Sequence, residues 1–449
     1  MVRQFGLLAL GVVIVGCSTS TKTKPAGPSS TKTEARPTSS ASPKAETKKT
    51  LLDWEPSERV VLKLWHTYRD KEREALTKAV ELFNSRSSRV ELVSNYTPYD
   101  GYENKLRITI DKGKGTKGPD LFIDAHDKLG SYTINKMVAP LNTLIDDASL
   151  SGFGEFVGRA MMQQSNLYGL PLALKPLAVF YNKKFVQSVP ASMEQFIATL
   201  KPLQARQRKA SGSGSTADKD GTFYGFVYEA GNLFYHGQWL SAYGGVVLDD
   251  ELRPMLDTRA QEQALAFARS LSKEHGFIPV GIDGNMLVSY FNNNQAAAVI
   301  SGPWLRASIN PEIEYGVAPI PTLADKVSKP FVTVEGVFVS RASKHLKAAA
   351  RAALFLASAE YARIRMETGL KVVAHAPTLE TSEDPVNRAF MAQAKNAVLL
   401  DARPEMSAVW KAVNEALNTG VFTDGAHIPS LLKRAQEDVA LELKKLGRI

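Results

Sequence analysis

Cysteine is nearly absent from this 449-residue sequence, which contains a single one, Cys17. One thiol cannot form a disulfide within the chain, and it cannot supply the several cysteines of a thiolate metal site. Long hydrophobic runs are also scarce, because after the first 20 residues no apolar stretch approaches the roughly 20 residues that span a bilayer. We therefore expect the region after Cys17 to be soluble and to fold without cross-links.

Patterns typical of catalysis are missing as well. The seven histidines do not have the spacing of metal ligands, and neither Gly-x-Ser-x-Gly nor His-Glu-x-x-His occurs. Paired carboxylates such as Asp146-Asp147 and Asp249-Asp250 lie in polar, turn-like contexts typical of exposed residues. A glycosidase would need two carboxylates that face each other, and nothing in the sequence indicates such a pair. We expect neither enzymatic activity nor a cofactor.

The charge is concentrated near the N-terminus. The chain has 55 Lys and Arg against 46 Asp and Glu, for a net charge of +9, and residues 1–50 hold eight of the basic and two of the acidic side chains. The remainder, with 47 against 44, is nearly balanced. Nucleic-acid binding is therefore not expected, because a phosphate-binding domain carries a marked basic excess.

The first 17 residues resemble a bacterial lipoprotein signal. Arg3 precedes the apolar run LLALGVVIVG, and Ile14-Val15-Gly16-Cys17 has the form of a lipobox. This resemblance implies that residues 1–16 are cleaved and that Cys17 carries lipid. The alternative is an uncleaved anchor, which the shortness of the run disfavours. In both cases the chain after Cys17 lies outside the cytoplasm.

Residues 17–56 are expected to form a disordered tether that follows the lipid. The stretch from Ser18 to Thr50 consists mainly of Ser, Thr, Lys, Ala and Pro, without aromatic residues, Val, Ile or Leu. Such a composition cannot bury a core. As a coil it spans roughly 30 Å, which holds a folded body away from the envelope surface.

Strands and helices are predicted to alternate along the body. The segment 60–65 reads as a buried strand, Leu76, Ala79, Val80 and Phe83 follow at helical spacing, and 90–93 alternates as a second strand. A helix from Tyr102 and a strand at 120–123 continue the pattern, which is typical of an α/β fold. Further strands are predicted at 177–181, 296–300 and 331–339, and helices at 346–356, from Ser358 to Gly369, 405–417 ending near Gly420, and 429–446.

Two polar segments interrupt this pattern. Residues 113–118, GKGTKG, are predicted to form a glycine turn, since the Gly-Lys-Ser/Thr of a phosphate loop does not follow. Residues 209–221 are rich in Gly and Ser and are predicted to be a loop.

Five segments in order resemble the maltose/maltodextrin-binding proteins. The first is GPDLFIDAHDKLG at 118–130, and the second is Pro171 with Tyr181-Asn182-Lys183. The third is Ile300-Ser301-Gly302-Pro303-Trp304. The fourth runs from Tyr315-Gly316-Val317 through Pro321-Thr322 to 328–332, and the fifth is Met406-Ser407-Ala408-Val409-Trp410. The resemblance extends over residues 58–446 and identifies the chain as a suspected member of the extracellular solute-binding protein family 1.

The resemblance implies a two-lobed α/β clamshell of periplasmic-binding-protein type II, with parallel-rich sheets flanked by helices. The N-terminal lobe would comprise residues 58–173 and 336–381, and the C-terminal lobe residues 177–331 and 386–449. Segments near 173–176, 332–335 and 382–385 would cross between the lobes. Closure of such lobes removes a polar ligand from water, and opening releases it.

The resemblance also implies ligand-binding residues in the cleft. Trp304 and Trp410 match stacking tryptophans, Phe234 or Tyr235 falls near a stacking tyrosine, and Asp127 matches a ligand-contacting aspartate. The alternative for each aromatic residue is a place in the core.

At other positions the charges depart from the family pattern. Lys128 replaces an arginine, Arg69 and Asp70 reverse an Asp-Lys pair, Asp124 and Arg306 each replace a tryptophan, and Lys175 replaces a glutamate. If these charges face the cleft, an acidic or substituted saccharide is as plausible a ligand as maltodextrin. The alternative is that they are solvated surface charges.

The sequence thus predicts a lipid-anchored, extracytoplasmic solute-binding protein. It would capture a maltose- or maltodextrin-like oligosaccharide and deliver it to the permease subunits of an ABC importer, as a monomer that touches the membrane through its lipid only. A ligand-sensing or structural lipoprotein that signals to a receptor is the alternative. The sugar and the membrane leaflet stay open.

Overall fold

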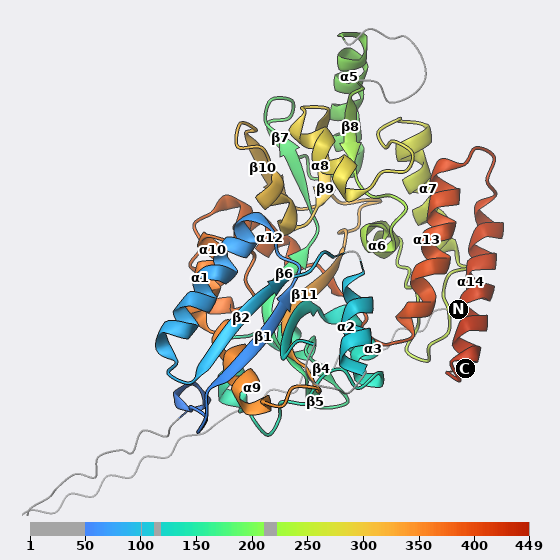
Figure 1. Ribbon diagram of the computed structural model, residues 1–449. Coiled ribbons are helices and arrows are strands. Elements are labelled where there is room, and N and C mark those ends of the chain that lie inside the picture. Colours follow the sequence, from blue (N-terminus) through green and yellow to red (C-terminus); the bar gives the residue numbers. More distant parts are fainter. Residues whose placement is uncertain (1–49, 100, 112–117, 211–221, 449) are drawn as a thin grey trace, which may run out of the picture. The chain divides into compact units, whose positions relative to one another are not determined.

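The computed structural model describes residues 50–99, 101–111, 118–210 and 222–448 (Figure 1). The predicted signal, Cys17 and the tether before residue 50 lie outside the described residues, and so do 112–117 of the predicted glycine turn and 211–221 of the predicted loop. Lys209 and Ala210, expected in that loop, are the last residues of helix α5 (Met193–Ala210).

The fold begins with the predicted strand, helix and strand. Strand β1 (Val60–His66) pairs in parallel with β2 (Val90–Tyr96), from Val60 opposite Val90 to His66 opposite Tyr96. Helix α1 (Asp70–Arg86) connects them and buries one face, Ala75, Leu76, Ala79 and Phe83. Because these residues recur at three to four positions, they form one apolar stripe that packs on the sheet. The predicted β-α-β opening is confirmed.

Six strands form the first sheet, in the order β12-β11-β3-β1-β2, with β6 beside β11. Strands β1, β2 and β3 are parallel, whereas β11 runs antiparallel to both β3 and β6. The other strands of this sheet are β3 (Leu121–Ala125), β6 (Gly169–Pro176), β11 (Phe331–Val339) and β12 (Val398–Leu399). Strand β11 is buried at every position after Phe331, which explains why its sequence is a nearly continuous apolar run.

Four strands form the second sheet, in the order β10-β7-β9-β8. Only β8 and β9 are parallel to each other, so both large sheets are mixed. The strands are β7 (Ala178–Asn182), β8 (Tyr224–Val227), β9 (Ala296–Ser301) and β10 (Tyr315–Ala318). A short hairpin, β4 (Met162–Gln163) with β5 (Asn166–Leu167), stands apart from both.

Helices cover the sheets (Figure 1). Besides α1 and α5, the α-helices are α2 (Tyr102–Asp111), α3 (Leu129–Ile134), α4 (Glu155–Arg159), α6 (Leu233–Ala242), α7 (Arg259–Lys273), α8 (Gly284–Asn292), α9 (Leu346–Leu356), α10 (Ala359–Glu367), α11 (Ala376–Glu380), α12 (Pro385–Ala394), α13 (Met406–Phe422) and α14 (Ile428–Lys445). The 3-10 helices are η1 (Leu51–Asp53), η2 (His126–Lys128), η3 (Asp147–Leu150) and η4 (Pro303–Ser308).

The predicted C-terminal helices are present, with one instructive difference. Helix α9 has the predicted bounds, and Ser358 caps α10 by accepting a hydrogen bond from the backbone nitrogen of Tyr361. Gly420, however, does not stop α13, which continues to Phe422. A Cβ at position 420 would lie 2.8 Å from a methyl of Leu265 on α7. The glycine, in the last turn of α13, therefore allows two helices to approach each other.

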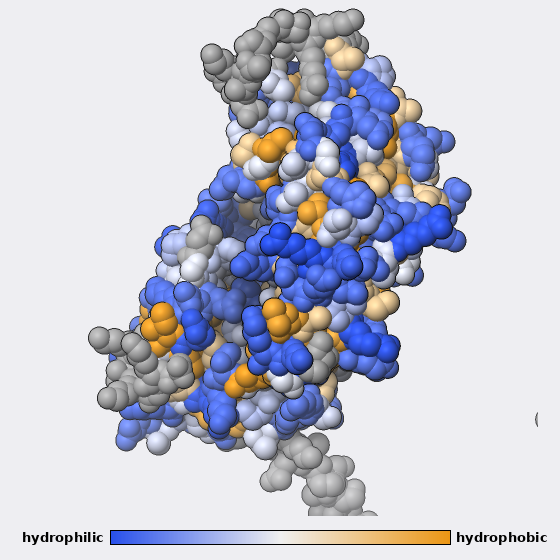
Figure 2. Space-filling view, turned by 90° about the vertical axis from the view of Figure 1, so that its right-hand side faces the viewer, coloured by the Kyte–Doolittle hydropathy of each residue, from blue (hydrophilic) through white to orange (hydrophobic). Residues whose placement is uncertain are grey.

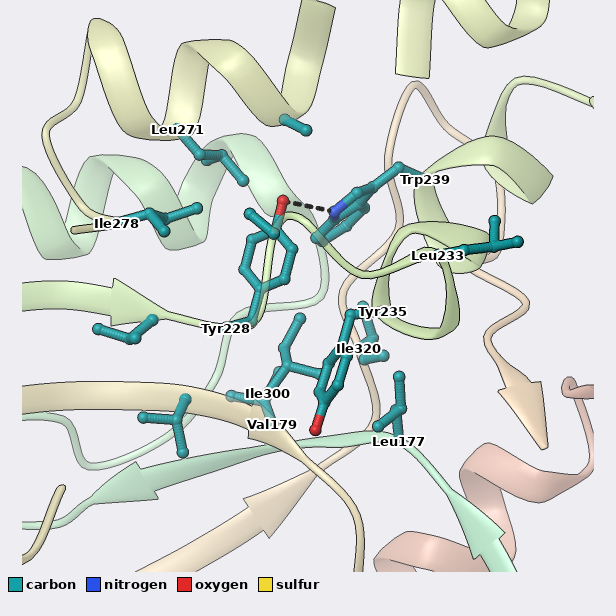
Figure 3. Packing of buried hydrophobic residues seen from close by; sticks show 14 of the residues in the cluster. Leu177, Val179, Tyr228, Leu233, Tyr235, Trp239, Leu271, Ile278, Ile300 and Ile320 are labelled. Carbon is teal, nitrogen blue, oxygen red and sulfur yellow. Dashed lines mark hydrogen bonds between the residues drawn. The ribbon is translucent and has the colours of Figure 1, made fainter. Parts of the chain in front are cut away.

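Each sheet has its own hydrophobic cluster. The first surrounds β1, β3 and β11, and the second surrounds β7, β8 and β9. In the second cluster the indole nitrogen of Trp239 donates to the Tyr228 hydroxyl at 3.0 Å, and Tyr235 packs nearby (Figure 3). Leu174 on β6 contacts both clusters. The chain then leaves the first sheet at Pro176 and enters the second at Ala178.

The face shown in Figure 2 is mainly hydrophilic, with apolar residues in small separate patches. Among the helices that the structure describes, none combines the length and the apolar character needed to span a membrane.

Candidate functional site

A cavity of about 760 Å³ lies where loops of the first sheet face α6 and α13. The first sheet contributes residues 67–70 after β1, and Asp127 and Lys128 after β3. Further lining comes from Glu229, Asn232, Phe234 and Tyr235, from η4 and from the first turns of α13. The carboxyl ends of the parallel strands β1 and β3 meet at this edge, which is where α/β sheets bind ligands. The volume is that of a small-molecule site.

Aromatic side chains from separate elements line the cavity. Trp304 lies in η4, Trp410 in α13 and Phe234 at the start of α6, and the ring centroids of Phe234 and Trp304 are 6.4 Å apart. Both tryptophans are half-buried and also contact the second cluster. Trp304 and Trp410 therefore each belong partly to the hydrophobic core and partly to the cavity lining. Tyr235, by contrast, is only 4% exposed.

Asp127 lines the cavity and has one carboxylate oxygen without a hydrogen-bond partner among the described residues. This oxygen, Oδ1, is buried. Burial raises the pKa of Asp127, against the opposing effect of Lys128. A buried acceptor without a partner costs free energy, so any donor that reached it would be bound favourably.

Asp124 lies behind Lys128 and does not line the cavity. It is 8% exposed, and it accepts from Lys128 at 3.2 Å and from the Tyr132 hydroxyl at 2.6 Å. Lys128 is also 3.9 Å from Glu103. Burial alone would lower the pKa of Lys128, but the charge of Asp124 is the main influence that raises it above its usual value. Lys128 is thus a neutralised cation on the cavity wall.

Lys175 faces a second carboxylate, Glu335 on the neighbouring strand. The ammonium of Lys175 is 3.7 Å from Glu335 and 5.8 Å from the centre of the Trp304 ring. Both charged residues line the cavity. Burial would raise the pKa of Glu335, but Lys371, Lys175 and Arg365 outweigh this effect and hold that pKa below its usual range.

Arg69 and Asp70 line the cavity at the start of α1, and both are exposed. The Arg69 Nε donates to the Tyr96 hydroxyl at 2.9 Å. Asp70 has a φ of +43°, a left-handed conformation that aspartate adopts more readily than most residues. Strained backbone of this kind is common at binding sites.

Arg306 does not line the cavity. It is 8% exposed and donates to Asp384 at 2.5 Å, to the Asn387 side chain at 3.0 Å and to the Leu370 carbonyl at 3.3 Å. It joins η4 to α12. Of the sequence-predicted residues, the cavity therefore brings together Arg69, Asp70, Asp127, Lys128, Lys175, Phe234, Tyr235, Trp304 and Trp410, and leaves out Asp124 and Arg306.

Several residues that line the cavity are not among those predicted from the sequence. Tyr99, Glu229, Asn232, Glu335, Lys371, Arg403 and Asn414 belong to this group. Glu335 had a detectable signal, since it is the only charge in the apolar run of β11. Burial also raises the pKa of Glu229, although hydrogen bonds from Tyr235 and Asn232 oppose the shift. The others had no such signal, because isolated polar residues of these types occur throughout the sequence.

Within the described residues no group of three or more His, Cys, Asp or Glu side chains is arranged to hold a metal ion.

Comparisons with known proteins match most of the chain. A family model described as bacterial extracellular solute-binding protein matches residues 69–363. A maltotriose-binding protein of Pyrococcus abyssi is 27% identical over 391 residues, which are 84% of this chain and 81% of the relative. A galactooligosaccharide-binding protein of Bacillus subtilis is 28% identical over 398 residues, 84% and 89% of the two chains. A maltooligosaccharide ABC transporter solute-binding lipoprotein of Streptococcus pneumoniae is 25% identical, over 69% and 73%.

A solved structure agrees with the fold. The maltotriose-binding protein of Thermus thermophilus, bound with maltotriose, matches with a TM-score of 0.73 and 21% identity, and the match covers 85% of this chain and 100% of that one. At this identity the likeness establishes the fold alone. The two-lobed α/β clamshell predicted from the sequence resemblance is confirmed.

Proposed function

Because this chain belongs to the bacterial extracellular solute-binding proteins, we propose that its cavity captures a maltodextrin-like oligosaccharide and delivers it to an ABC importer. The ligands in the names of the relatives, maltotriose, galactooligosaccharide and maltooligosaccharide, support this class of ligand. The family is one of binding proteins, so we propose no catalytic step.

The arrangement around Asp127 carries the proposal. Asp127 lines the cavity together with Trp304, Trp410 and Phe234, and its buried Oδ1 has no partner among the described residues. A sugar ring has apolar faces that stack on aromatic rings and a rim of hydroxyls that donate to carboxylates. A purely apolar ligand would leave the carboxylate oxygen without a partner, at a cost of about 1–3 kcal/mol.

The charges of the cavity favour a neutral sugar over the acidic one that the sequence left open. Lys128 is paired with Asp124, Lys175 with Glu335, and Arg403 with Asp401 at 2.6 Å. A ligand carboxylate would have to compete with each of these internal partners. Cations that are already neutralised give an acid little additional attraction.

The sequence-predicted residues take different parts in this proposal. Trp304, Trp410 and Phe234 stack on the sugar, Asp127 and Lys128 bind its hydroxyls, and Arg69 and Asp70 bind at the start of α1. Asp124 and Arg306 act indirectly, by fixing Lys128 and η4. The lobe limits predicted from the sequence, 58–173 with 336–381 and 177–331 with 386–449, are part of the same proposal.

The cellular setting is proposed from the sequence and the family. The chain would be an extracytoplasmic lipoprotein held through Cys17, and it would act as a monomer on permease subunits. The lipoprotein from Streptococcus pneumoniae supports this arrangement. A sensor that presents its closed form to a receptor is the second candidate. Neighbouring genes for two permease subunits would favour the importer.

Calorimetric titration tests the ligand class. The panel contains maltose, maltotriose, maltotetraose and galactooligosaccharides, and we expect at least one of them to bind the protein without its first 49 residues. Asp127→Asn keeps the shape of the side chain but removes the charge. We expect it to weaken binding about tenfold or more, because hydrogen bonds to charged groups contribute roughly 1.5–3 kcal/mol.

The matched control is Asp146→Asn, at an exposed turn where the carboxylate accepts from Ser149. It should leave binding unchanged. If no saccharide in the panel binds, or if Asp127→Asn binds as tightly as the wild type, this proposal is wrong.

A further inference from the structure

Glu335 is surrounded by more cations than one carboxylate can neutralise. It accepts hydrogen bonds from Arg365 at 2.5 Å, from Lys371 at 3.4 Å and from the Tyr68 hydroxyl, and Lys175 lies at 3.7 Å. These partners come from α10, the segment after it, the loop after β1 and strand β6. One other carboxylate belongs to the cluster, Glu72, at 2.5 Å from Lys371. Glu335 and Glu72 thus offset most of the charge of the three cations, and Asp124 and Asp127 also act on Lys175.

Burial makes these interactions strong. Glu335 is 4%, Arg365 2% and Lys371 4% exposed. Arg365 is held between the rings of Tyr68 and Tyr361, at 5.5 and 5.3 Å from their centres. Its Nε and Nη1 have no hydrogen-bond partner among the described residues. Charges in such surroundings are poorly screened by water, so one additional or missing carboxylate has a large effect on what can bind beside them.

Three groups of this cluster line the cavity itself, namely Glu335, Lys175 and Lys371. Lys175 connects the cluster to the sugar platform, since its ammonium also lies over the Trp304 ring. A carboxylate on a sugar stacked at Trp304 would approach the same two lysines that Glu335 already binds. Glu335 and an acidic ligand would thus compete for one set of donors.

We propose that Glu335 is an internal counter-ion that fills the anion position of the cavity, and so makes the protein select neutral over acidic oligosaccharides. The inference rests on the proposed function, because it concerns the ligand of the same cavity. Glu335 is a specificity-determining residue in this account. Its carboxylate occupies the position in which a uronic acid would be bound.

Removal of Glu335 should therefore create affinity for an acid. Two variants test this. Glu335→Gln keeps the size of the side chain and removes its charge. Glu335→Gln with Arg365→Met also removes the buried cation, so that no charge is left without compensation if the single variant does not fold. Thermal unfolding establishes which variants are folded, and Glu55→Gln is the matched control, because Glu55 pairs with the buried Arg351 at 3.0 Å and does not line the cavity.

The probes are maltotriose and two derivatives with a single C6 carboxylate, one on each terminal ring. The measured quantity is the ratio of the dissociation constants of acid and neutral sugar. In the wild type and in Glu55→Gln we expect the neutral sugar to bind at least about tenfold tighter. In the Glu335 variants the ratio should shift toward one of the acids by about tenfold or more, since charge-assisted hydrogen bonds are about twice as strong as neutral ones.

An unchanged ratio in a folded Glu335 variant would overturn the inference. Loss of all three sugars by a folded double variant would also overturn it, because Glu335 would then be required to assemble the cavity and not to discriminate between ligands. Binding of maltotriose by the wild type tests the proposed function separately, and only the change in the ratio tests the role of Glu335.

Discussion

Trp304 and Trp410 each have two environments, with part of the ring against the second hydrophobic cluster and part on the cavity. Trp304→Ala and Trp410→Ala should each weaken saccharide binding by about 1–3 kcal/mol, because the variant loses a stacking face. Calorimetry gives the loss of affinity. Thermal unfolding reports the contribution of each ring to packing.

Trp54→Ala is the control for this pair, since Trp54 is half-buried against the first cluster and does not line the cavity. It should reduce stability without changing affinity. Normal saccharide binding by both cavity variants, with early unfolding, would show that these rings serve the core alone.

Single residues also show how far the sequence predicted the site. The Gly302-Pro303 context located Trp304 on the cavity, but Arg306, two positions later, points elsewhere. With three residues per turn in a 3-10 helix, side chains two apart lie on different sides. Asp124 and Lys128 also differ in position, because Lys128 lines the cavity and Asp124 lies behind it. The partners of Glu335 at positions 365 and 371 lie far along the chain, so no local pattern could have indicated the cluster.

At the scale of elements, the predictions succeeded where apolar residues recur at a clear period or form a continuous run. The structure places β1, β11 and α9 within a residue or two of the predicted limits, and α1 buries most of its predicted apolar stripe. Helix α13 ends near Gly420 as predicted, but the contact of Gly420 with Leu265 could not be foreseen, because a glycine that ends a helix and one that allows close packing look the same in a sequence. The strand order could not be predicted either, since β11 joins the first sheet from a distant part of the chain.

Gly130 provides an element-scale prediction, because α3 packs there against the segment 402–404. A Cβ at position 130 would lie 2.7 Å from the backbone nitrogen of Pro404 and closer still to the carbonyl oxygen of Ala402. Gly130→Ala should therefore destabilise the fold by about 1–3 kcal/mol, as measured by urea unfolding. It should also weaken saccharide binding, because Asp127 and Arg403 flank this contact.

Gly158→Ala is the matched substitution in α4, where a Cβ would meet nothing within 4 Å. It should be neutral or slightly stabilising, since alanine favours a helix. If the two substitutions had equal effects, the close approach of α3 and residues 402–404 would not constrain position 130.

For the whole molecule, buried histidines make stability depend on pH. Burial lowers the pKa of His66, His126 and His236 to about 4 in each case, although the hydrogen bond of His126 to the Leu400 carbonyl opposes the shift. In the unfolded chain a histidine has a pKa of about 6.5. The free energy of unfolding is therefore unaffected by these histidines above about pH 6.5. It decreases as the pH falls from about 6.5 to 4, by up to roughly 3 kcal/mol per histidine, because the unfolded chain takes up the protons.

Urea unfolding between pH 7.5 and 4 measures this loss. Both ring nitrogens of His236 have no partner among the described residues, so His236→Leu should be tolerated and should flatten the pH dependence. His345→Gln, at an exposed position, should reproduce the wild-type slope. A slope that is the same in all three proteins would mean that His236 does not take up a proton on unfolding.

The predicted lipid anchor is also a property of the whole molecule. Cys17→Ser should move the protein from the membrane to the soluble fraction, because the thiol that would be acylated is gone and the basic tether gives only weak attraction to anionic lipids. Fractionation followed by immunoblotting measures the distribution. Tight retention of the variant in the membrane fraction would contradict the lipoprotein prediction.

The pairing of β6 with β11 has a mechanical consequence. Val332, Thr333 and Val334 are in register with Pro176, Lys175 and Leu174, at the point where the chain leaves one sheet for the other. Strand β12 pairs with the other edge of β11 here, with Val332 opposite Leu399, so three strands lie side by side. Strands joined in this way bend more readily out of their common plane than they slide within it, because sliding would break the ladder. The paired strands should therefore bend most easily in one direction, out of the plane of the sheet. We expect the two halves to approach along a single path, which returns Lys175 and Glu335 to the same geometry in every cycle.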